Sequence, residues 1–274
     1  MEGLKAVLKR IFINRNFGLL FLGRLVSQIG DGVNYFALTW LILDLTGSGA
    51  ALSTLLLVSS IPAVVLSPFT GVLADMWDRK RIVVLTDIVR GLILVSLGAI
   101  HAAGMLTLPI LYAGTALSSI CSVLFGPAIS AAIPGMVKRE ELTAANARNN
   151  FSRSATGIIG PALGALLLGF VGYSGVFVIN GICFLLSAVS EMFIQFPKQE
   201  VHVSQTGRDQ IRAYGTNFKE GFAFIWQHTS LRSLIGFAIA LNFIAAPLFN
   251  IVMPYFSKEV LDMSTEHYGL IKST

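Results

Sequence analysis

Four polar side chains recur along an otherwise apolar run near the start of the chain. Arg24, Gln28, Asp31 and Tyr35 follow a helical spacing, so they lie within about 60° of one another on a helix surface. An ionised side chain facing lipid near the bilayer centre costs about 2.5–3.5 kcal/mol, so this stripe should face a water-filled cavity. The sequence therefore predicts a polar cavity lined by this helix.

Asp31 is the candidate for chemistry in that cavity, because a carboxylate there can bind a proton reversibly or bind a cation. Arg24, Gln28 and Tyr35 are expected to line the same space, and Asn242, in a later apolar run, is a further candidate. A structural alternative stays open, in which Asp31 pairs with Arg24 and the arginine extends to the membrane surface.

Another acid and base lie inside a later apolar run. Asp87 and Arg90 are separated by one helical turn, a spacing at which opposite charges pair on one helix. We expect them to form a structural ion pair within that helix.

Small residues recur at helical spacing further along the chain, in the order Gly157, Gly160, Pro161, Gly164. Such a face lets another helix backbone approach closely, and the proline favours a kink. The sequence predicts a close helix contact here.

The composition indicates the kind of secondary structure in which these polar and small residues lie. Only 13% of the residues are charged and 54% are hydrophobic, with a mean hydropathy of +0.72, whereas soluble domains carry about 25% charged residues. Apolar runs long enough to cross a bilayer recur along the chain. The sequence thus predicts an all-α integral membrane protein with the lipid bilayer as a partner, and the expected helices span 17–43, 50–75, 82–103, 108–133, 154–172, 175–196 and 231–254.

The basic residues are distributed unevenly among the connections. Most of the 20 Lys and Arg residues lie before the first helix or after the second, fourth and sixth. By the positive-inside rule these segments, including the N-terminus, are cytoplasmic. We expect a multi-pass protein of the plasma membrane. The net charge of +5 reflects this topology, so no nucleic-acid partner is expected.

The sequence contains no pattern typical of catalysis. It has no phosphate-binding glycine loop and no nucleophile–base set, and its four histidines lack ligand spacing. Cys121 and Cys183 lie in apolar runs and are expected to pack as small core residues. We therefore expect no enzyme activity, cofactor or metal site.

Residues 71–81 join two apolar runs through a charged turn. They resemble the signature between helices 2 and 3 of the major facilitator superfamily, in the order Gly71-x-Leu73-Ala74-Asp75-x-x-x-Arg79-Lys80. The chain departs from that signature at Met76, where a basic residue is usual, and at Asp78, where glycine is usual. The resemblance implies a cytoplasmic gate formed by Gly71, Asp75, Arg79, Lys80 and Arg81 and supported by Asp87 and Arg90.

Three further matches resemble the macrolide-efflux and enterobactin-exporter branch of that superfamily. They are Ser27-x-x-Gly30-Asp31, the run 140–146, and Gly157-x-x-Gly160-Pro161-x-x-Gly164. The last is similar to the helix 5 motif of antiporters, with Ala165 replacing its final glycine. Both a packing role and a role in export direction stay open for it. The run 108–133 lacks the arginine that many proton-coupled relatives carry there.

The resemblance covers residues 15–274 and implies a transporter built from two six-helix halves. It divides the chain into a cytoplasmic N-terminus (1–16), a six-helix bundle (17–196), a cytoplasmic linker with an amphipathic helix (197–230) and an incomplete second half (231–274) with helix 7 and a stub of helix 8. It implies proton-coupled export of a small amphipathic drug or metabolite, macrolide- or siderophore-like, by alternating access.

Two alternatives stay open, and a third is disfavoured. The chain could be a truncated product that does not transport, or an importer of another small molecule within the same superfamily. A seven-helix receptor or photosensor is disfavoured by the cytoplasmic N-terminus and by the absence of a lysine in the run 231–254 for a retinal Schiff base.

Overall fold

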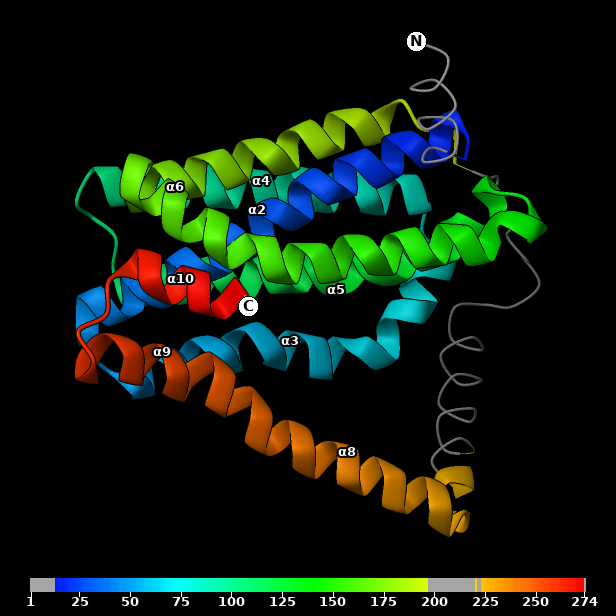
Figure 1. Cartoon of the computed structure of the whole chain (residues 1–274). Coiled ribbons are helices and arrows are strands. Elements are labelled where there is room, and N and C mark those ends of the chain that lie inside the picture. Colours follow the sequence, from blue (N-terminus) through cyan, green and yellow to red (C-terminus); the bar gives the residue numbers. More distant parts are fainter. Residues whose placement is uncertain (1–12, 197–219, 221–222, 274) are drawn as a thin grey trace.

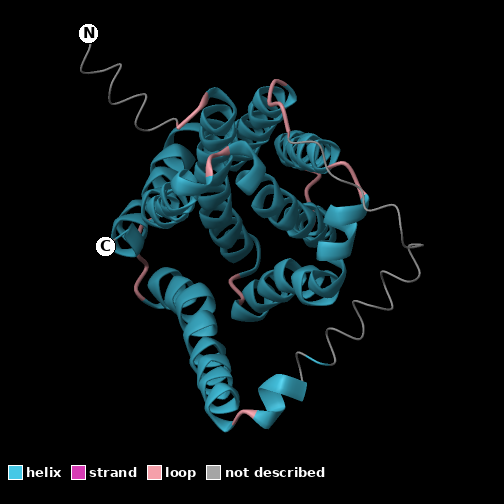
Figure 2. Ribbon diagram, turned by 90° about the vertical axis from the view of Figure 1, so that its right-hand side faces the viewer, coloured by secondary structure: helices cyan, strands magenta, loops and turns pink. Residues whose placement is uncertain are grey.

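The computed structural model describes residues 13–196, 220 and 223–273, and the side chains of residues 68, 71–76 and 273 lie outside that description. Throughout the described part, the regular structure is helical and contains no strand (Figures 1 and 2). The first helices are α2 (Arg15–Thr46), α3 (Gly49–Met76), α4 (Arg79–Ala102) and α5 (Leu108–Met136).

Side-chain caps define where two of these helices begin. Asn14 accepts a hydrogen bond from the backbone N–H of Phe17 at the start of α2, and Asp78 accepts one from Arg81 at the start of α4. Asn and Asp are preferred at this position because their oxygens satisfy backbone donors that the helix leaves free. Asp78 therefore serves as a helix cap in the turn between α3 and α4.

The expected helices 154–172 and 175–196 form one longer element. After a short 3₁₀ turn, η1 (Arg139–Glu141), α6 runs from Leu142 to Met192 and is interrupted by non-helical backbone at Gly172, where φ is 63° and ψ is −177°. Glycine adopts positive φ without the penalty of a Cβ atom. The expected loop before residue 154 is thus helical, which corrects the boundary, and its alanines favour helix.

The expected helix 231–254 is longer and less regular than the sequence indicates. It comprises α8 (Thr229–Pro247), the π-helical η2 (Leu248–Val252), α9 (Met253–Tyr255) and the π-helical η3 (Phe256–Val260). A final helix, α10 (Thr265–Ser273), follows. Of the expected linker 197–230, residues 197–219 and 221–222 lie outside the described part, and residues 223–227 are helical.

The helices are arranged lengthwise in a bundle with two distinct ends (Figure 1). One, here named the basic end, carries Arg15, Arg79, Lys80, Arg81 and Lys138. The other, the opposite end, carries the turn after α2, the turn after α4 and the break at Gly172. Each end has its own cluster of buried apolar side chains, around Ile129 at the basic end and Leu111 at the opposite end.

Apolar side chains also cover much of the outer surface. Val64, Phe170, Phe237 and Phe243 are each at least 70% exposed, as expected where lipid replaces water. Among the described residues, five helical segments are long and apolar enough to cross a membrane. Polar residues interrupt α2, which is outside that set although its 32 residues provide sufficient length. The prediction of an all-α membrane fold is confirmed.

Helix α8 departs from the bundle toward the basic end. None of its residues is buried, and the π-helical segment that follows it approaches α3 near the opposite end. Figures 1 and 2 show α8 extending away from the other helices as it approaches the basic end.

Candidate functional site

A cavity of about 600 Å³ lies between α2, α4, α5 and α6 and is bounded by η2 and α10. Six charged side chains line it, which are Arg24, Asp31, Asp87, Arg90, Arg153 and Lys272. Charged groups inside a membrane bundle are costly unless they face water or one another. These charged side chains therefore lie in the cavity and not on the apolar outer surface.

The polar stripe predicted on residues 24–35 faces this cavity. Arg24, Gln28, Asp31 and Tyr35 all line it. Gln28 accepts a hydrogen bond from Ser152 of α6 at 2.6 Å, and Tyr35 donates one to Asn250 of η2 at 3.1 Å. These contacts join α2 to elements distant in sequence.

Asp31 is paired with Arg90. Arg90 Nη2 of α4 lies 2.7 and 2.9 Å from the two carboxylate oxygens of Asp31 on α2. The guanidinium also stacks 4.0 Å from the ring centre of Phe184, and its side chain is 11% exposed against 42% for Asp31. The Asp31 carboxylate thus contacts the buried guanidinium of Arg90 and is also accessible from the cavity.

This pairing corrects two expectations. Arg24 does not pair with Asp31 but lies over Phe125 of α5, 5.7 Å from the ring centre. Asp87 and Arg90 do not form the expected pair within α4, because Arg90 turns toward α2 and neither Asp87 oxygen accepts a hydrogen bond from a described residue.

Asn242 does not line the cavity. It is exposed on α8, and its amide donates to the backbone carbonyl of Ala238 at 2.9 Å. Asn250 lines the cavity instead. The π-helical turns of η2 change the helical register between the two asparagines, and an α-helical reading of the sequence does not include that change.

The small-residue motif has two kinds of position. A Cβ atom added to Gly160 would lie 2.8 Å from Gly32 Cα, and one on Gly164 would lie 3.0 Å from Phe36 Cβ, so α2 and α6 are in close contact here. Gly157 has open space around it and lines the cavity with Pro161.

The residues of the charged turn contact different helix ends. Arg79 donates to the carbonyl of Ala131 at 2.9 Å, and Lys80 donates to those of Met192 and Ile194 at 2.6 and 3.0 Å. A cation is favourable where a helix leaves its last carbonyls unpaired. The side chains of Gly71 and Asp75 lie outside the described part, and that of Arg81 is exposed.

The sequence indicates that Glu191 is an interfacial acid near a helix end, but the structure buries it. Its side chain is 0% exposed, and Ser187 donates to its Oε1 at 3.5 Å. The spacing of Ser187 and Glu191 places them on one face of α6, which is the available sequence signal.

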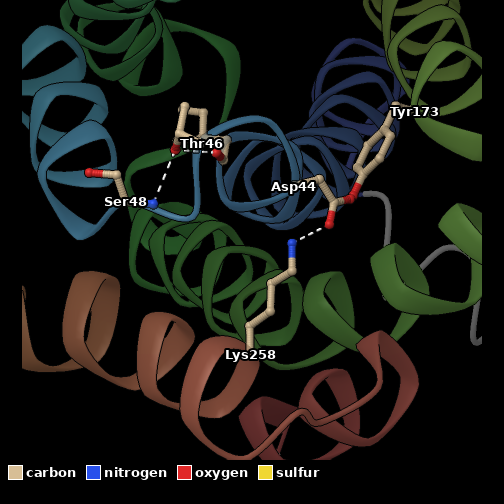
Figure 3. A network of polar contacts seen from close by, with 6 residues as sticks. Asp44, Thr46, Ser48, Tyr173 and Lys258 are labelled. Atoms are coloured by element: carbon tan, nitrogen blue, oxygen red, sulfur yellow. Dashed lines mark hydrogen bonds and ion pairs between the residues drawn. The ribbon is translucent and has the colours of Figure 1, made fainter.

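Two groups of contacts lie at the opposite end. The rings of Phe36, Trp40 and Tyr268 pack together with centroids 5.1–6.2 Å apart. Nearby, Asp44 of α2 accepts hydrogen bonds from Tyr173 of α6 and from Lys258 of η3 (Figure 3). Together they join α2, α6, η3 and α10.

The described helices thus form a membrane-type bundle around a cavity lined by charged side chains. The sequence pattern of the Major Facilitator Superfamily matches residues 20–274, and the chain belongs to that family.

Curated relatives include exporters. The chain is 28% identical to the uncharacterized MFS-type transporter YkuC of Bacillus subtilis over 95% of its length and 59% of the relative's. It is 26% identical to macrolide efflux protein A of Streptococcus pyogenes, covering 93% and 62% of the two chains. For the multidrug efflux pump Tap of Mycobacterium bovis the identity is 25%, covering 89% and 60%. The chain thus spans about 60% of the length of these relatives.

Proposed function

We propose that this chain contributes the substrate pathway of a secondary active exporter that exchanges protons for a small amphipathic drug or metabolite, macrolide- or siderophore-like. The observation that carries the proposal is the cavity with six charged side chains inside a membrane bundle. Polar cavities of this kind mark substrate and ion pathways. The relatives named as macrolide and multidrug efflux proteins support export.

We propose that the protein lies in the plasma membrane. Its basic end then faces the cytoplasm, in accord with the positive-inside rule. The contacts of Asp44 and the Phe36–Trp40–Tyr268 cluster then close the extracellular end. Helix α8 leaves the bundle toward the basic end, and we infer that the cavity opens toward the cytoplasm in this conformation. Alternating access requires these two ends to open in turn.

Asp31 is proposed to take part in transport through its pairing with Arg90. The carboxylate faces the cavity, so a substrate or a proton competes with Arg90 for the same oxygens. A group with two alternative partners can couple a binding event to movement of the helices that carry those partners.

The remaining sequence motifs are assigned by the same proposal. Residues 71–81, Asp87 and Arg90 form the inner gate, with Lys80 holding the end of α6. The chain divides into the N-terminus (1–16), the first bundle (17–196), the linker (197–230) and the start of the second half (231–274).

Efflux from cells that express this protein tests the proposal. Cells loaded with ethidium or erythromycin should lose the compound faster than cells with an empty vector, and a protonophore should abolish the difference. Efflux that persists without a proton gradient would exclude proton coupling. Accumulation of the compound in the cells would identify an importer.

A further inference from the structure

Two carboxyl groups lie buried next to each other at the wall of the cavity. Asp87 of α4 and Glu191 of α6 are each 0% exposed, and they come from two helices that pack against each other. Asp87 also lines the cavity, which gives the pair a route to water.

Within the described part of the chain, neither carboxyl has the partners that an ionised group needs. Both oxygens of Asp87 and Oε2 of Glu191 lack a hydrogen bond, and the nearby Ser187 donates to Glu191 Oε1 at 3.5 Å. Neither acid is within 4.0 Å of a basic nitrogen among the described residues. A buried carboxylate without donors is strongly disfavoured relative to the neutral acid.

Charged groups approach the pair from α2 and α4. They are Arg24 and Asp31 of α2 and Arg90 of α4, and the Cys121 thiol of α5 lies near Asp87. Arg90 is engaged by Asp31. Nε of Arg24 and Nε of Arg90 are buried without a hydrogen-bond partner in the described structure.

We propose that Asp87 and Glu191 form the proton-binding site of this protein and that each holds a proton in the described conformation. This inference rests on the proposed proton-coupled export and assigns its coupling proton to the buried pair in place of Asp31. The proton leaves a carboxyl O–H for water in the cavity, and no other bond changes.

Release of the proton gives Arg90 a second acceptor. Asp87 lies one helical turn before Arg90 on α4, a spacing at which the two side chains can pair. When Asp87 becomes ionised, Arg90 turns from Asp31 to Asp87, and the Asp31 carboxylate is left free in the cavity. Loss of the proton from Asp87 thereby exposes the negative charge of Asp31 in the cavity where substrate binds.

Infrared difference spectroscopy of the purified chain in lipid tests this site without any substrate. As the pH is raised, the wild type should lose a carbonyl stretching band of a protonated, buried carboxylic acid. Separate ¹³C labelling of aspartate and of glutamate should each shift part of that band, because both acids are protonated. This measurement on the wild type does not depend on the folding of a variant.

Three variants sharpen the test. The double variant Asp87→Asn/Glu191→Gln should lose the band, and Glu140→Gln, at an exposed position of η1, should leave it unchanged. Asp31→Asn should move the loss of the band to lower pH, because Arg90 is then available to Asp87 throughout.

A wild-type spectrum without a titrating carboxyl band would overturn the inference, as would a band unaffected by the double substitution. Either result leaves proton-driven efflux to be judged by its own assay. Conversely, a titrating Asp87–Glu191 pair in a protein without efflux would reject the proposed function and keep the proton site.

Discussion

Arg90 of α4 contacts Asp31 of α2 at 2.7 Å and leaves Asp87, its neighbour one turn earlier on the same helix, without a hydrogen bond among the described residues. The ion pair therefore joins two helices across the cavity wall. Its energetic and functional consequences can be measured separately.

A double-mutant cycle measures the stability of this pair. Asp31→Asn should lower the free energy of unfolding by about 1–3 kcal/mol, because it replaces the carboxylate that pairs with the buried Arg90 guanidinium by a neutral amide. Arg90→Gln should restore part of that loss in the Asp31→Asn background. Thermal unfolding of the purified chain, followed by helical circular dichroism, provides the comparison. Strictly additive losses would show that the two side chains are not coupled.

Two glycines of one motif should respond differently to the same substitution. Gly160→Ala should destabilise the protein by about 1–3 kcal/mol, since the new Cβ would meet backbone atoms that cannot turn aside. Gly157→Ala is the matched control, because open space surrounds it and alanine favours helix. Equal unfolding temperatures for the two variants would contradict the close crossing of α2 and α6.

The packing of α10 on α2 can be followed through Trp40, which is 4% exposed. In a background carrying Trp77→Phe and Trp226→Phe, Tyr268→Ala should shift Trp40 emission to longer wavelength, because it uncovers one face of the indole. Phe243→Ala, at an 80% exposed position, is the control and should leave the spectrum unchanged. An unchanged spectrum in Tyr268→Ala would show that α10 does not cover Trp40.

Lys80 should stabilise the end of α6. Lys80→Ala removes both hydrogen bonds to the carbonyls of Met192 and Ile194, worth about 1 kcal/mol each. Hydrogen exchange near the end of α6 should become faster in Lys80→Ala and stay unchanged in Arg81→Ala, whose side chain is exposed. Similar hydrogen-exchange rates in both variants would show that Lys80 does not stabilise the end of α6.

Properties of single helices could be predicted from the sequence. Helical periodicity placed Arg24, Gln28, Asp31 and Tyr35 on one face, and all four line the cavity. The pairing of Asp31 could not be predicted, because it depends on how α2 and α4 are rotated against each other across 59 positions of sequence. The local spacing of Asp87 and Arg90 predicted an ion pair between them, whereas Arg90 pairs with Asp31.

Departures from regular helix account for other differences. The π-helical turns of η2 bring Asn250 to Tyr35 and leave Asn242 outside. Glu191 lies near a helix end, where a sequence alone indicates an exposed acid, yet tertiary packing buries it fully. Burial of this kind is a property of several helices together.

The role of Asp31 in transport is tested most directly by the initial rate of proton-driven ethidium efflux from cells expressing this protein. Asp31→Asn should reduce that rate about tenfold or more, equivalent to about 1.4 kcal/mol, at a matched amount of protein in the membrane. Asn242→Ala, outside the cavity, is the control and should retain the wild-type rate. Equal rates for Asp31→Asn and wild type would contradict a transport pathway through the Asp31–Arg90 cavity.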